Sequence, residues 1–517
     1  DARRAGRSDQ DLAIAAALAA ARGLPAEPPF RPLLPPLPAT LPHTAVAGAG
    51  GVPYGLMDDP DNQAQPAMAL DLGGTERLMV AGGPQSGRTT FCRTLISSLA
   101  ARCSPSQVWL YVVENQPGGL SAYADLPHCG AVAGSGEPDR VRRIVTWLAS
   151  EVERRRLSRL TPGEPSSPVI VFVIDGWECF EDRGSPDWYE TPLLATLRSV
   201  VAGGPPVGIH TVAAGGHDML RGKTPDLFSQ RLFLPFAREE TRRSYLSSGM
   251  VSPPVLPGRA IEAASGLHVQ VCLPPDHIPT ARHSRPADLA KQFPPLPAVV
   301  PLARLEGAAI GVGGPDVTPV ELDLFDLGPH LVLVSGPSGS GRSNAALVMA
   351  TVLLRAGVQV LAIAPPRSPL VQSLPGARTL AGTSFADADL REAVADFDRY
   401  AVVVDDFDQI TITARQENFD TLPTLLQDIV APSSLGRRAL VLAGDATPVL
   451  EGQRRSMAGE VTEMLRSGTR FLLTPASRVH AREHGVNLEP DQFFAGPPGR
   501  GYAGTARRLD LVQFAVL

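Results

Sequence analysis

The stretch Gly82-Gly83-Pro84-Gln85-Ser86-Gly87-Arg88-Thr89-Thr90 decides the fold that we expect for this chain of 517 residues. It follows the apolar run Leu78–Ala81 and precedes residues 91–100, which have the pattern of a helix. A strand, a glycine-rich turn and a helix in this order predict a phosphate cradle, because backbone N–H groups of the turn and of the helix N-terminus converge on an anion. The spacing from Gly82 to Gly87 is that of the P-loop, G-x-x-x-x-G-K-[ST], with Arg88 in place of the lysine.

The same stretch occurs a second time, again after an apolar run and again with arginine, as Gly336-Pro337-Ser338-Gly339-Ser340-Gly341-Arg342-Ser343-Asn344. Flanking motifs repeat as well. Pro35-Pro36-Leu37-Pro38-Ala39 recurs as Pro294-Pro295-Leu296-Pro297-Ala298, and Pro257-Gly258-Arg259 is echoed by Pro498-Gly499-Arg500. The chain is therefore predicted to be a tandem duplication of one nucleotide-binding module.

Composition sets limits on the architecture and on the partners. The length predicts two or three domains, the repeat indicates two large ones, and 44% hydrophobic residues suffice for ordinary globular cores. A net charge of −6 gives no overall attraction to nucleic acid, so DNA binding would need a local basic surface. The five cysteines are scattered without a C-x-x-C pair, which favours a reduced cytosolic setting over disulfides or zinc. No apolar run approaches the roughly 20 residues of a membrane span.

Each loop is followed by an apolar strand that ends in an acid, at residues 168–175 and 400–406. This is the Walker B form, in which an aspartate holds the Mg²⁺ shell opposite the hydroxyl of the P-loop. Loop and acid lie 93 residues apart in the first module and 69 in the second, so the second is predicted to lack an insertion or helix. The predicted magnesium residues are Thr89, Asp175, Ser343 and Asp405.

Both predicted sites depart from those of hydrolysing enzymes. Arg88 and Arg342 keep the charge of lysine, but a guanidinium is larger and forms different contacts. Hydrolysing relatives carry a glutamate after the Walker B aspartate, whereas Gly176 and Asp406 stand there. The backbone cradle does not depend on these side chains, so we expect ATP or ADP with Mg²⁺ in each module and little or no hydrolysis. The alternative is that both loops are packing units without nucleotide.

The predicted fold class is α/β, with two tandem P-loop NTPase modules whose mostly parallel sheets are flanked by helices. We expect a helix and a Pro-rich linker at 1–45, the first module at 46–275, a linker at 276–300 and the second module at 301–517. The N-terminal helix is expected to begin with a capping box of Ser8 and Asp11. Because the chain begins with Asp1, we expect it to be a piece of a longer protein.

Three other features carry alternatives. The segment from Phe30 to Pro38 is interpreted as a spacer or, alternatively, as an apolar peptide that packs on a module. The triplet Arg154-Arg155-Arg156 is interpreted as the solvated face of a helix, with a nucleic-acid patch as the alternative. His210 is expected to be a packed or capping histidine and not a catalytic one.

Taken in order, these motifs resemble the FtsK/SpoIIIE-type ATPases. The chain is most similar to the tandem modules of the EccC proteins, the coupling ATPases of type VII secretion, and to related multi-module proteins of actinobacteria. The resemblance covers nearly the whole chain. It is carried by residues 80–87, Gly118-Gly119-Leu120, residues 126–132, Gly208-Ile209-His210, both Pro-Gly-Arg triplets and the linker motif at residues 33–38.

The resemblance implies RecA-like modules, of which later ones are degenerate and regulatory. It implies an active ATPase module upstream, a membrane anchor outside this chain, a place at the inner face of the cell membrane among membrane-embedded secretion components, and a homo-hexameric assembly. It also implies that small helical secreted proteins of the WXG100 type, or their signal peptides, are partners. Asp175 and Asp405 match the family's Mg²⁺ acid, while Arg88 and Arg342 depart from its lysine.

We therefore expect ATP-binding, hydrolysis-deficient modules that regulate a secretion motor and recruit its protein substrate. One alternative is a DNA-translocating ATPase of the same superfamily, which the acidic net charge and the altered loops argue against. The other is a non-transport adaptor with structural P-loop modules. A lysine-bearing P-loop module and membrane helices upstream would favour transport, and a phosphopeptide-binding module would favour the adaptor.

Overall fold

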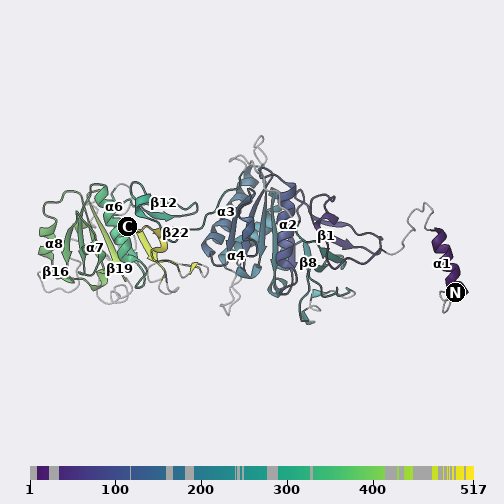
Figure 1. Ribbon diagram of the computed structural model, residues 1–517. Helices are drawn as coiled ribbons and strands as arrows, with labels where there is room; N and C mark the ends of the chain where they lie inside the picture. Colours follow the sequence, from purple (N-terminus) through teal and green to yellow (C-terminus); the bar gives the residue numbers. More distant parts are fainter. Residues whose placement is uncertain are drawn as a thin grey trace.

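In the computed structural model, two sheets of ten strands each form the frame of the described chain, one sheet for each module (Figure 1). Helices lie beside each sheet. The structure describes residues 8–21, 34–116, 118–158, 167–180, 191–238, 240–241, 245–246, 250–275, 289–325, 330–413, 428–429, 436–445, 469–475, 481, 486, 488–489, 492–493, 496–505 and 508–517.

The first sheet has the strand order β2-β1-β10-β9-β8-β3-β7-β6-β4-β5. The run from β8 to β5 is parallel, and the remaining strands extend it in antiparallel fashion. The strand that precedes the glycine loop, β3, therefore lies inside the sheet between β7 and β8. The bounds are β1 (Val52–Asp58), β2 (Ala67–Leu70), β3 (Leu78–Ala81), β4 (Val108–Glu114), β5 (Cys129–Gly134), β6 (Val169–Asp175), β7 (Ile209–Gly215), β8 (Gln230–Phe233), β9 (Arg259–Glu262) and β10 (His268–Val271).

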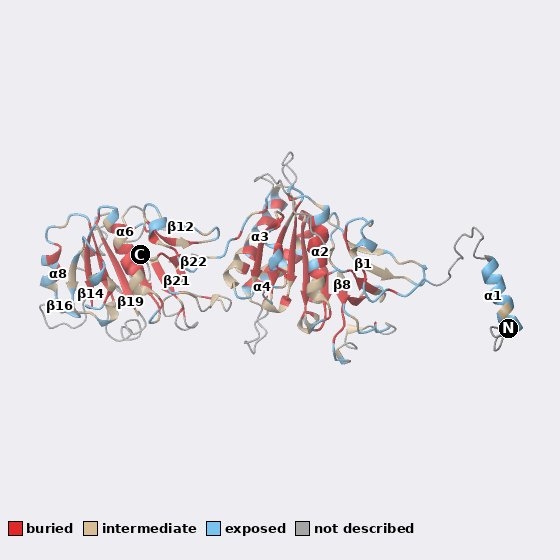
Figure 2. Ribbon diagram, in the orientation of Figure 1, coloured by how far each residue is buried: buried red, intermediate tan, exposed pale blue. Residues whose placement is uncertain are grey.

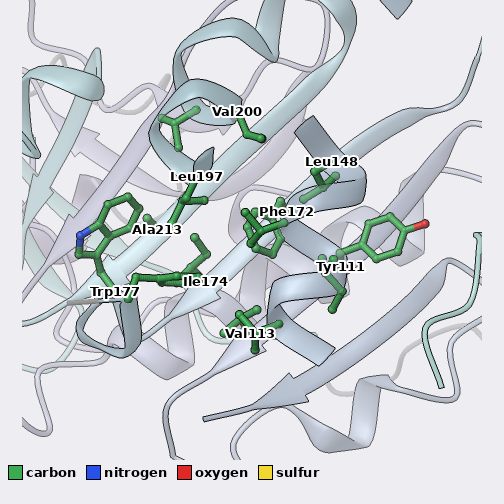
Figure 3. Close-up of a cluster of buried hydrophobic side chains, with 14 of the residues drawn as sticks. Tyr111, Val113, Leu148, Phe172, Ile174, Trp177, Leu197, Val200 and Ala213 are labelled. Atoms are coloured by element: carbon green, nitrogen blue, oxygen red, sulfur yellow. The ribbon is translucent and has the colours of Figure 1, made fainter. Parts of the chain in front are cut away.

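Helices cover both faces of this sheet, so its central strands are buried on both sides (Figure 2). Leu78 and Val80 of β3 belong to the cluster with α2 (Arg88–Arg102). Their neighbours along the strand face the cluster with α3 (Pro138–Ser158) and α4 (Pro192–Gly203), as the alternation of a strand requires. In Figure 3 the side chains of Phe172 and Ile174 from β6 lie among those of α3 and α4.

The second sheet repeats the scheme, in the order β12-β11-β22-β21-β20-β13-β19-β17-β14-β15. Its apolar core is built around α6 (Arg342–Arg355), with α7 (Pro369–Gln372) and α8 (Asp387–Ala393) beside it. The strands are β11 (Ala309–Gly313), β12 (Thr318–Glu321), β13 (Leu331–Ser335), β14 (Gln359–Ala364), β15 (Arg378–Ala381), β17 (Tyr400–Asp405), β19 (Arg438–Gly444), β20 (Thr469–Leu473), β21 (Arg500–Thr505) and β22 (Arg508–Phe514), while β16 (Ser384–Ala386) and β18 (Thr411–Thr413) form a separate pair.

The shorter spacing in the second module has a structural origin. Between the sheet's edge strand and the Walker B strand, the first module has α3 with 21 residues, whereas the second has α8 with 7. The predicted loss of an insertion or helix is therefore a shorter helical segment at this edge.

The α/β class with two tandem P-loop modules is confirmed. The sequence analysis missed several short strands of the antiparallel extensions, such as β2, β9 and β12, because their apolar pattern is too short to identify them. The capping box is also confirmed, since the Ser8 N–H donates to Asp11 Oδ2 at 3.0 Å and the Asp11 N–H donates to Ser8 Oγ at 3.2 Å.

The interpretation of the arginine triplet was wrong for its middle member. Arg155 is buried, because its guanidinium donates to Glu151 at 2.7 Å and to the carbonyl of Pro168 at 2.8 Å. Its neighbours Arg154 and Arg156 form ion pairs with glutamates of the same helix. Arg155 thus connects α3 to the start of the strand that follows it.

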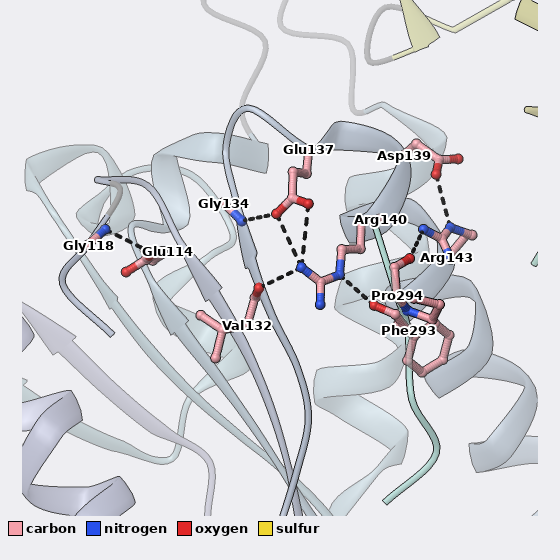
Figure 4. Close-up of polar contacts among 10 residues, drawn as sticks. All are labelled: Glu114, Gly118, Val132, Gly134, Glu137, Asp139, Arg140, Arg143, Phe293 and Pro294. Atoms are coloured by element: carbon pink, nitrogen blue, oxygen red, sulfur yellow. Dashed lines mark hydrogen bonds and ion pairs between the residues drawn. The ribbon is translucent and has the colours of Figure 1, made fainter. Parts of the chain in front are cut away.

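The second Pro-rich segment packs on the first module. Phe293 is 1% exposed, and its ring lies 5.7 Å from that of Tyr111 and 5.4 Å from that of Trp147. The main chain is held too, because the Phe293 N–H donates to the Gly130 carbonyl at 3.1 Å. Arg140 donates to the Phe293 carbonyl at 2.6 Å (Figure 4). Residues 291–293 therefore act as an added piece of the first module.

The first Pro-rich segment is described from residue 34 onwards, and residues 30–33 lie outside the described part. Leu37 is buried, and its carbonyl accepts a hydrogen bond from Arg259 at 2.9 Å. The described end of this segment therefore packs on the module.

Adding one methyl group at Gly130 should loosen the second segment. A Cβ there would overlap the Tyr111 ring and the Lys291 carbonyl oxygen, so Gly130→Ala should destabilise the docked segment by about 1–3 kcal/mol. We expect faster amide hydrogen exchange at residues 291–293. Gly136→Ala is the control, since a Cβ at Gly136 meets nothing within 4 Å. Equal exchange in the two variants would contradict the packing described above.

Candidate nucleotide-binding sites

The first glycine loop is packed so tightly that a side chain at Gly82 would overlap its neighbours. A Cβ on Gly82 would lie 2.5 Å from Ser86 Oγ and 2.7 Å from Leu234 Cβ. Gly87, at the N-cap of α2, has a φ of 107°, a region that favours glycine. Ser86 Oγ is buried and has no hydrogen-bond partner among the residues that the structure describes. The loop thus delivers backbone N–H groups to the positive end of a helix dipole.

The predicted magnesium residues of the first module meet. Thr89 Oγ1 donates to Asp175 Oδ2 at 2.7 Å, although the two residues come from α2 and from the end of β6. Burial raises the pKa of Asp175, while the Thr89 hydrogen bond and the charge of Arg88 oppose that rise. A hydroxyl and a carboxylate side by side under a phosphate loop are the protein groups that a phosphate-bound Mg²⁺ uses.

Arg88 is engaged by Glu178, an acid to which the sequence analysis assigned no role. Its Nη1 lies 3.2 Å from Oε1 of Glu178, in the 3-10 helix η3 (Trp177–Phe180) directly after the Walker B strand. The same oxygen accepts from the N–H of Gly216. Both side chains are largely shielded, at 25% and 10% exposure, so the contact is stronger than a surface ion pair. Glu178 therefore fixes where the arginine points.

The position after the first Walker B aspartate is closed to any side chain. Gly176 has a φ of 114°, and a Cβ there would overlap the side chain of Asn115. A glutamate that orients water from this position is therefore excluded by both conformation and space.

A second acid, Glu114, lies at the same edge of the sheet. It ends β4 and pairs in register with Asp175 of β6. One carboxylate oxygen accepts from the Gly118 N–H at 3.1 Å (Figure 4), and the other accepts from the Leu120 N–H at 2.7 Å. Glu114 thereby shapes the glycine turn beside Thr89. Only its place at the end of a strand signalled a role.

The second module builds a similar site with different side chains. Ser368 Oγ donates to Asp405 Oδ2 at 2.6 Å, and Ser343 also hydrogen-bonds this carboxylate. Burial raises the pKa of Asp405, and its Oδ1 has no hydrogen-bond partner within the described part of the chain. Ser368, the N-cap of α7, was missed because an isolated serine after a strand carries no specific signal.

Asp406, in the position of the catalytic glutamate, is held by two arginines. Its carboxylate lies 3.8 Å from Arg342 and 3.2 Å from Arg367. Its backbone has a φ of 51°, which is uncommon for a residue other than glycine. The P-loop arginine thus faces an acid in both modules, Glu178 in the first and Asp406 in the second.

His210 is a packed histidine, as expected. It is 1% exposed, and its Nε2 lies 3.1 Å from the carbonyl oxygen of Leu72. Burial lowers its pKa.

Within the residues that the structure describes, no helix has both the length and the apolar character needed to cross a bilayer.

Comparison with known proteins shows which family and which proteins this chain resembles. The FtsK/SpoIIIE family matches residues 55–160, from β1 through the first loop into α3. The ESX secretion system protein EccC of Thermomonospora curvata is 30% identical over 368 residues, which cover 61% of this chain and 27% of that protein. The ESX-1 secretion system protein EccCb1 of Mycolicibacterium smegmatis is 28% identical over 378 residues, which cover 63% of this chain and 62% of that protein.

Solved structures of two such proteins share the fold. Thermomonospora curvata EccC (ATPases 2 and 3), in complex with a signal sequence peptide, superposes with a TM-score of 0.61 at 22% identity, covering 95% of this chain and 99% of that one. EssC (ATPases 2 and 3) from Geobacillus thermodenitrificans gives 0.59 at 18% identity, covering 93% and 100%. The chain therefore contains an FtsK/SpoIIIE domain, its sequence is related to the EccC proteins of ESX secretion systems, and its two modules have the fold of their ATPases 2 and 3.

Proposed function

We propose that this chain is a pair of ATP-binding, hydrolysis-deficient modules that regulate a type VII secretion motor and recruit its protein substrate. Nucleotide binding rests on one observation above all: the hydroxyl of Thr89 and the carboxylate of Asp175 meet at 2.7 Å, beneath a glycine loop at a helix N-terminus.

The residues present fit a nucleotide with Mg²⁺ in both modules. Backbone N–H groups of the loops would hold the phosphates, and Arg88 or Arg342 would add positive charge. Thr89 with Asp175, and Ser343 with Asp405, would hold the metal; the open Oδ1 of Asp405 is a suitable ligand atom. When bound, Mg²⁺ neutralises charge on the phosphates.

Weak hydrolysis follows from the groups that surround these loops. A working site orients water with a carboxylate and stabilises charge with a free cation. In the first module, the position after Asp175 accepts no side chain, and Glu178 engages the loop arginine. In the second, Asp406 pairs with Arg342 and Arg367 and is not free to orient water.

The secretion context rests on the relatives. EccC and EccCb1 are named as components of ESX secretion systems. The chain spans about a quarter of the Thermomonospora protein. We therefore include in the proposal an upstream active ATPase module, membrane-embedded components and a hexameric assembly.

Binding of an extended peptide has a parallel within this chain. The first module already seats an extended apolar segment at the edge of β5, with Phe293 in a socket and carbonyls bonded to Arg140 and Arg143. At the corresponding edge of the second module, β15 is followed by the short α8 in place of α3. We propose that the signal peptide of a small helical secreted protein, of the WXG100 type, docks at this edge. The EccC structure with a signal sequence peptide supports a peptide ligand.

DNA translocation is the weaker candidate. Apart from the net charge of −6, the densest basic stretch forms no open patch, because Arg155 is buried and its neighbours pair with glutamates. The non-transport adaptor remains the second alternative, and the sequence upstream discriminates it.

The purified protein should retain ATP or ADP, at about one per module, and should hydrolyse Mg-ATP no faster than background. Nucleotide content is measured by denaturing the protein and separating the supernatant by ion exchange, and turnover is measured by phosphate release. A turnover near the ~1–100 s⁻¹ of working phosphoryl-transfer enzymes, abolished by Asp175→Ala or Asp405→Ala, would refute the proposed deficiency.

Removing the charge of Glu178 should strengthen nucleotide binding to the first module. Glu178→Gln keeps an acceptor for the Gly216 N–H but frees Arg88, so we expect affinity to rise about three- to tenfold, equivalent to roughly 0.7–1.4 kcal/mol. Isothermal titration with Mg-ADP measures this. Glu153→Gln is the control, because that glutamate is exposed and pairs with Arg156 of its own helix. Unchanged or weaker binding in Glu178→Gln would show that the acid does not compete with phosphate.

A fluorescent peptide with the C-terminal signal of a WXG100-type protein should bind with a dissociation constant in the micromolar range, about −8 kcal/mol. Fluorescence anisotropy measures the binding, and a scrambled peptide is the control. Equal binding of both peptides would refute recruitment through the signal.

A further inference from the structure

The Pro-Gly-Arg turn of each module touches the phosphate loop with one residue and the Pro-rich segment with the next. In the first module the Gly258 N–H donates to the carbonyl of Ser86 at 2.8 Å. Arg259, the next residue, donates through Nη2 to the carbonyls of Leu37 and Pro38 at 2.9 and 3.0 Å. Two consecutive residues of the turn, Gly258 and Arg259, therefore contact the nucleotide loop and the linker.

The contact with the loop is backbone against backbone. A Cβ on Gly87 would lie 2.9 Å from the Gly258 nitrogen, and Gly258 itself has a φ of 74°. The peptide between Ser86 and Gly87 is trans, so its N–H points away from its carbonyl. By fixing the Ser86 carbonyl, the turn directs the Gly87 N–H to the opposite side, towards the space that a phosphate would fill.

The contact with the linker is rigid as well. Arg259 is 6% exposed, and its Nε donates to Gln270 Oε1 at 2.8 Å. With the guanidinium held at that side, Nη2 meets two successive linker carbonyls. A movement of the turn would break these bonds, because a planar guanidinium can satisfy all three acceptors in one orientation only.

The second module repeats each contact with different surroundings. The Gly499 N–H donates to the Ser340 carbonyl at 2.7 Å. Arg500 Nη2 donates to the carbonyls of Leu296 and Pro297 at 2.8 and 2.6 Å, and its Nε donates to Gln513 at 3.1 Å. Two modules with different Walker B surroundings thus keep one linkage from linker to loop.

In the second module this linkage reaches the neighbouring module. Phe293, three residues before Leu296, sits in the socket of the first module. Arg143 of α3 donates to the carbonyls of Pro294 and Pro315, and Lys291 pairs with Asp316 at 2.7 Å. Continuous contacts therefore run from the core of the first module through the linker and Arg500 to the second nucleotide loop.

We infer that phosphate binding and linker docking are thermodynamically coupled in each module through the Pro-Gly-Arg turn. The docked linker holds the turn, the turn holds the loop in its binding conformation, and a bound phosphate in turn stabilises the docked linker. Coupling of this kind is reciprocal. The inference rests on the proposed function, because it requires that the loops bind nucleotide, and it makes nucleotide in the second module a determinant of how the modules are tied together.

The test uses the full chain, with Mg-ADP as the probe. Amide hydrogen exchange reads the loops at residues 82–91 and 336–345 and the linkers at residues 34–42 and 296–300 separately. In the wild type, Mg-ADP should slow exchange in the loops and also in the linkers. Arg500→Ala should weaken Mg-ADP binding to the second loop about five- to tenfold and abolish the nucleotide-dependent protection of residues 296–300, while the first module responds normally. Arg259→Ala should weaken Mg-ADP binding to the first loop and abolish the nucleotide-dependent protection of residues 34–42, while the second module responds normally.

Arg391→Ala is the matched control, because that arginine lies in the second module and forms surface ion pairs with Asp387 and Asp428. If Arg500→Ala does not fold, Phe293→Ala undocks the same linker without touching the second module, and should also weaken Mg-ADP binding to the second loop.

The experiment distinguishes failure of the coupling from failure of the proposed function. Wild-type binding of Mg-ADP with unchanged affinity and loop exchange in Arg500→Ala and Phe293→Ala would overturn the coupling but leave the proposed function intact. Absence of Mg-ADP binding in the wild type would overturn the proposed function and the coupling with it.

Discussion

Close approach of backbone to backbone at the glycine loops is the constraint on which the rest of the structure depends. The Pro-Gly-Arg turn lies against the loop with no room for a Cβ, at Gly87 against Gly258 and at Gly341 against Gly499. Such contacts require glycine at the loop's end, a left-handed turn opposite it, and strands that bring both to one edge of the sheet. The antiparallel strands β9 and β21 place the turns there.

The duplication separates what the backbone does from what the side chains do. Both modules keep the loop, the aspartate, the turn and the docked linker. The groups around the Walker B acid differ, with Gly176 and Glu178 in one module and Asp406 with Ser368 in the other. Retained cradles and altered side chains are what binding without turnover requires, since phosphate is held by N–H groups while hydrolysis needs an oriented water.

Much of this could be predicted from local pattern. Glycine spacing after an apolar strand and an acid at the end of a second strand identify residues whose roles depend on neighbours in sequence. Arg155 shows where such reasoning fails: three consecutive arginines suggest a solvated face, but a helix turns by 100° per residue, and the middle arginine points to the carbonyls of another element. Glu178 and Ser368 were assigned no role from the sequence for a related reason, because single polar residues acquire a role only from their partners.

The tandem modules, their α/β class, the two loops and the two Walker B acids follow from the amino-acid order, because strand pattern, helix pattern and glycine turns are local properties of the chain. The contact of Thr89 with Asp175, the pairing of Glu178 with Arg88, and the connection of linker to loop through Arg259 and Arg500 arise only in the folded chain. These pairs are separated by 86 to 222 residues. Their meeting is set by the order and register of strands in the sheet, which no local pattern encodes.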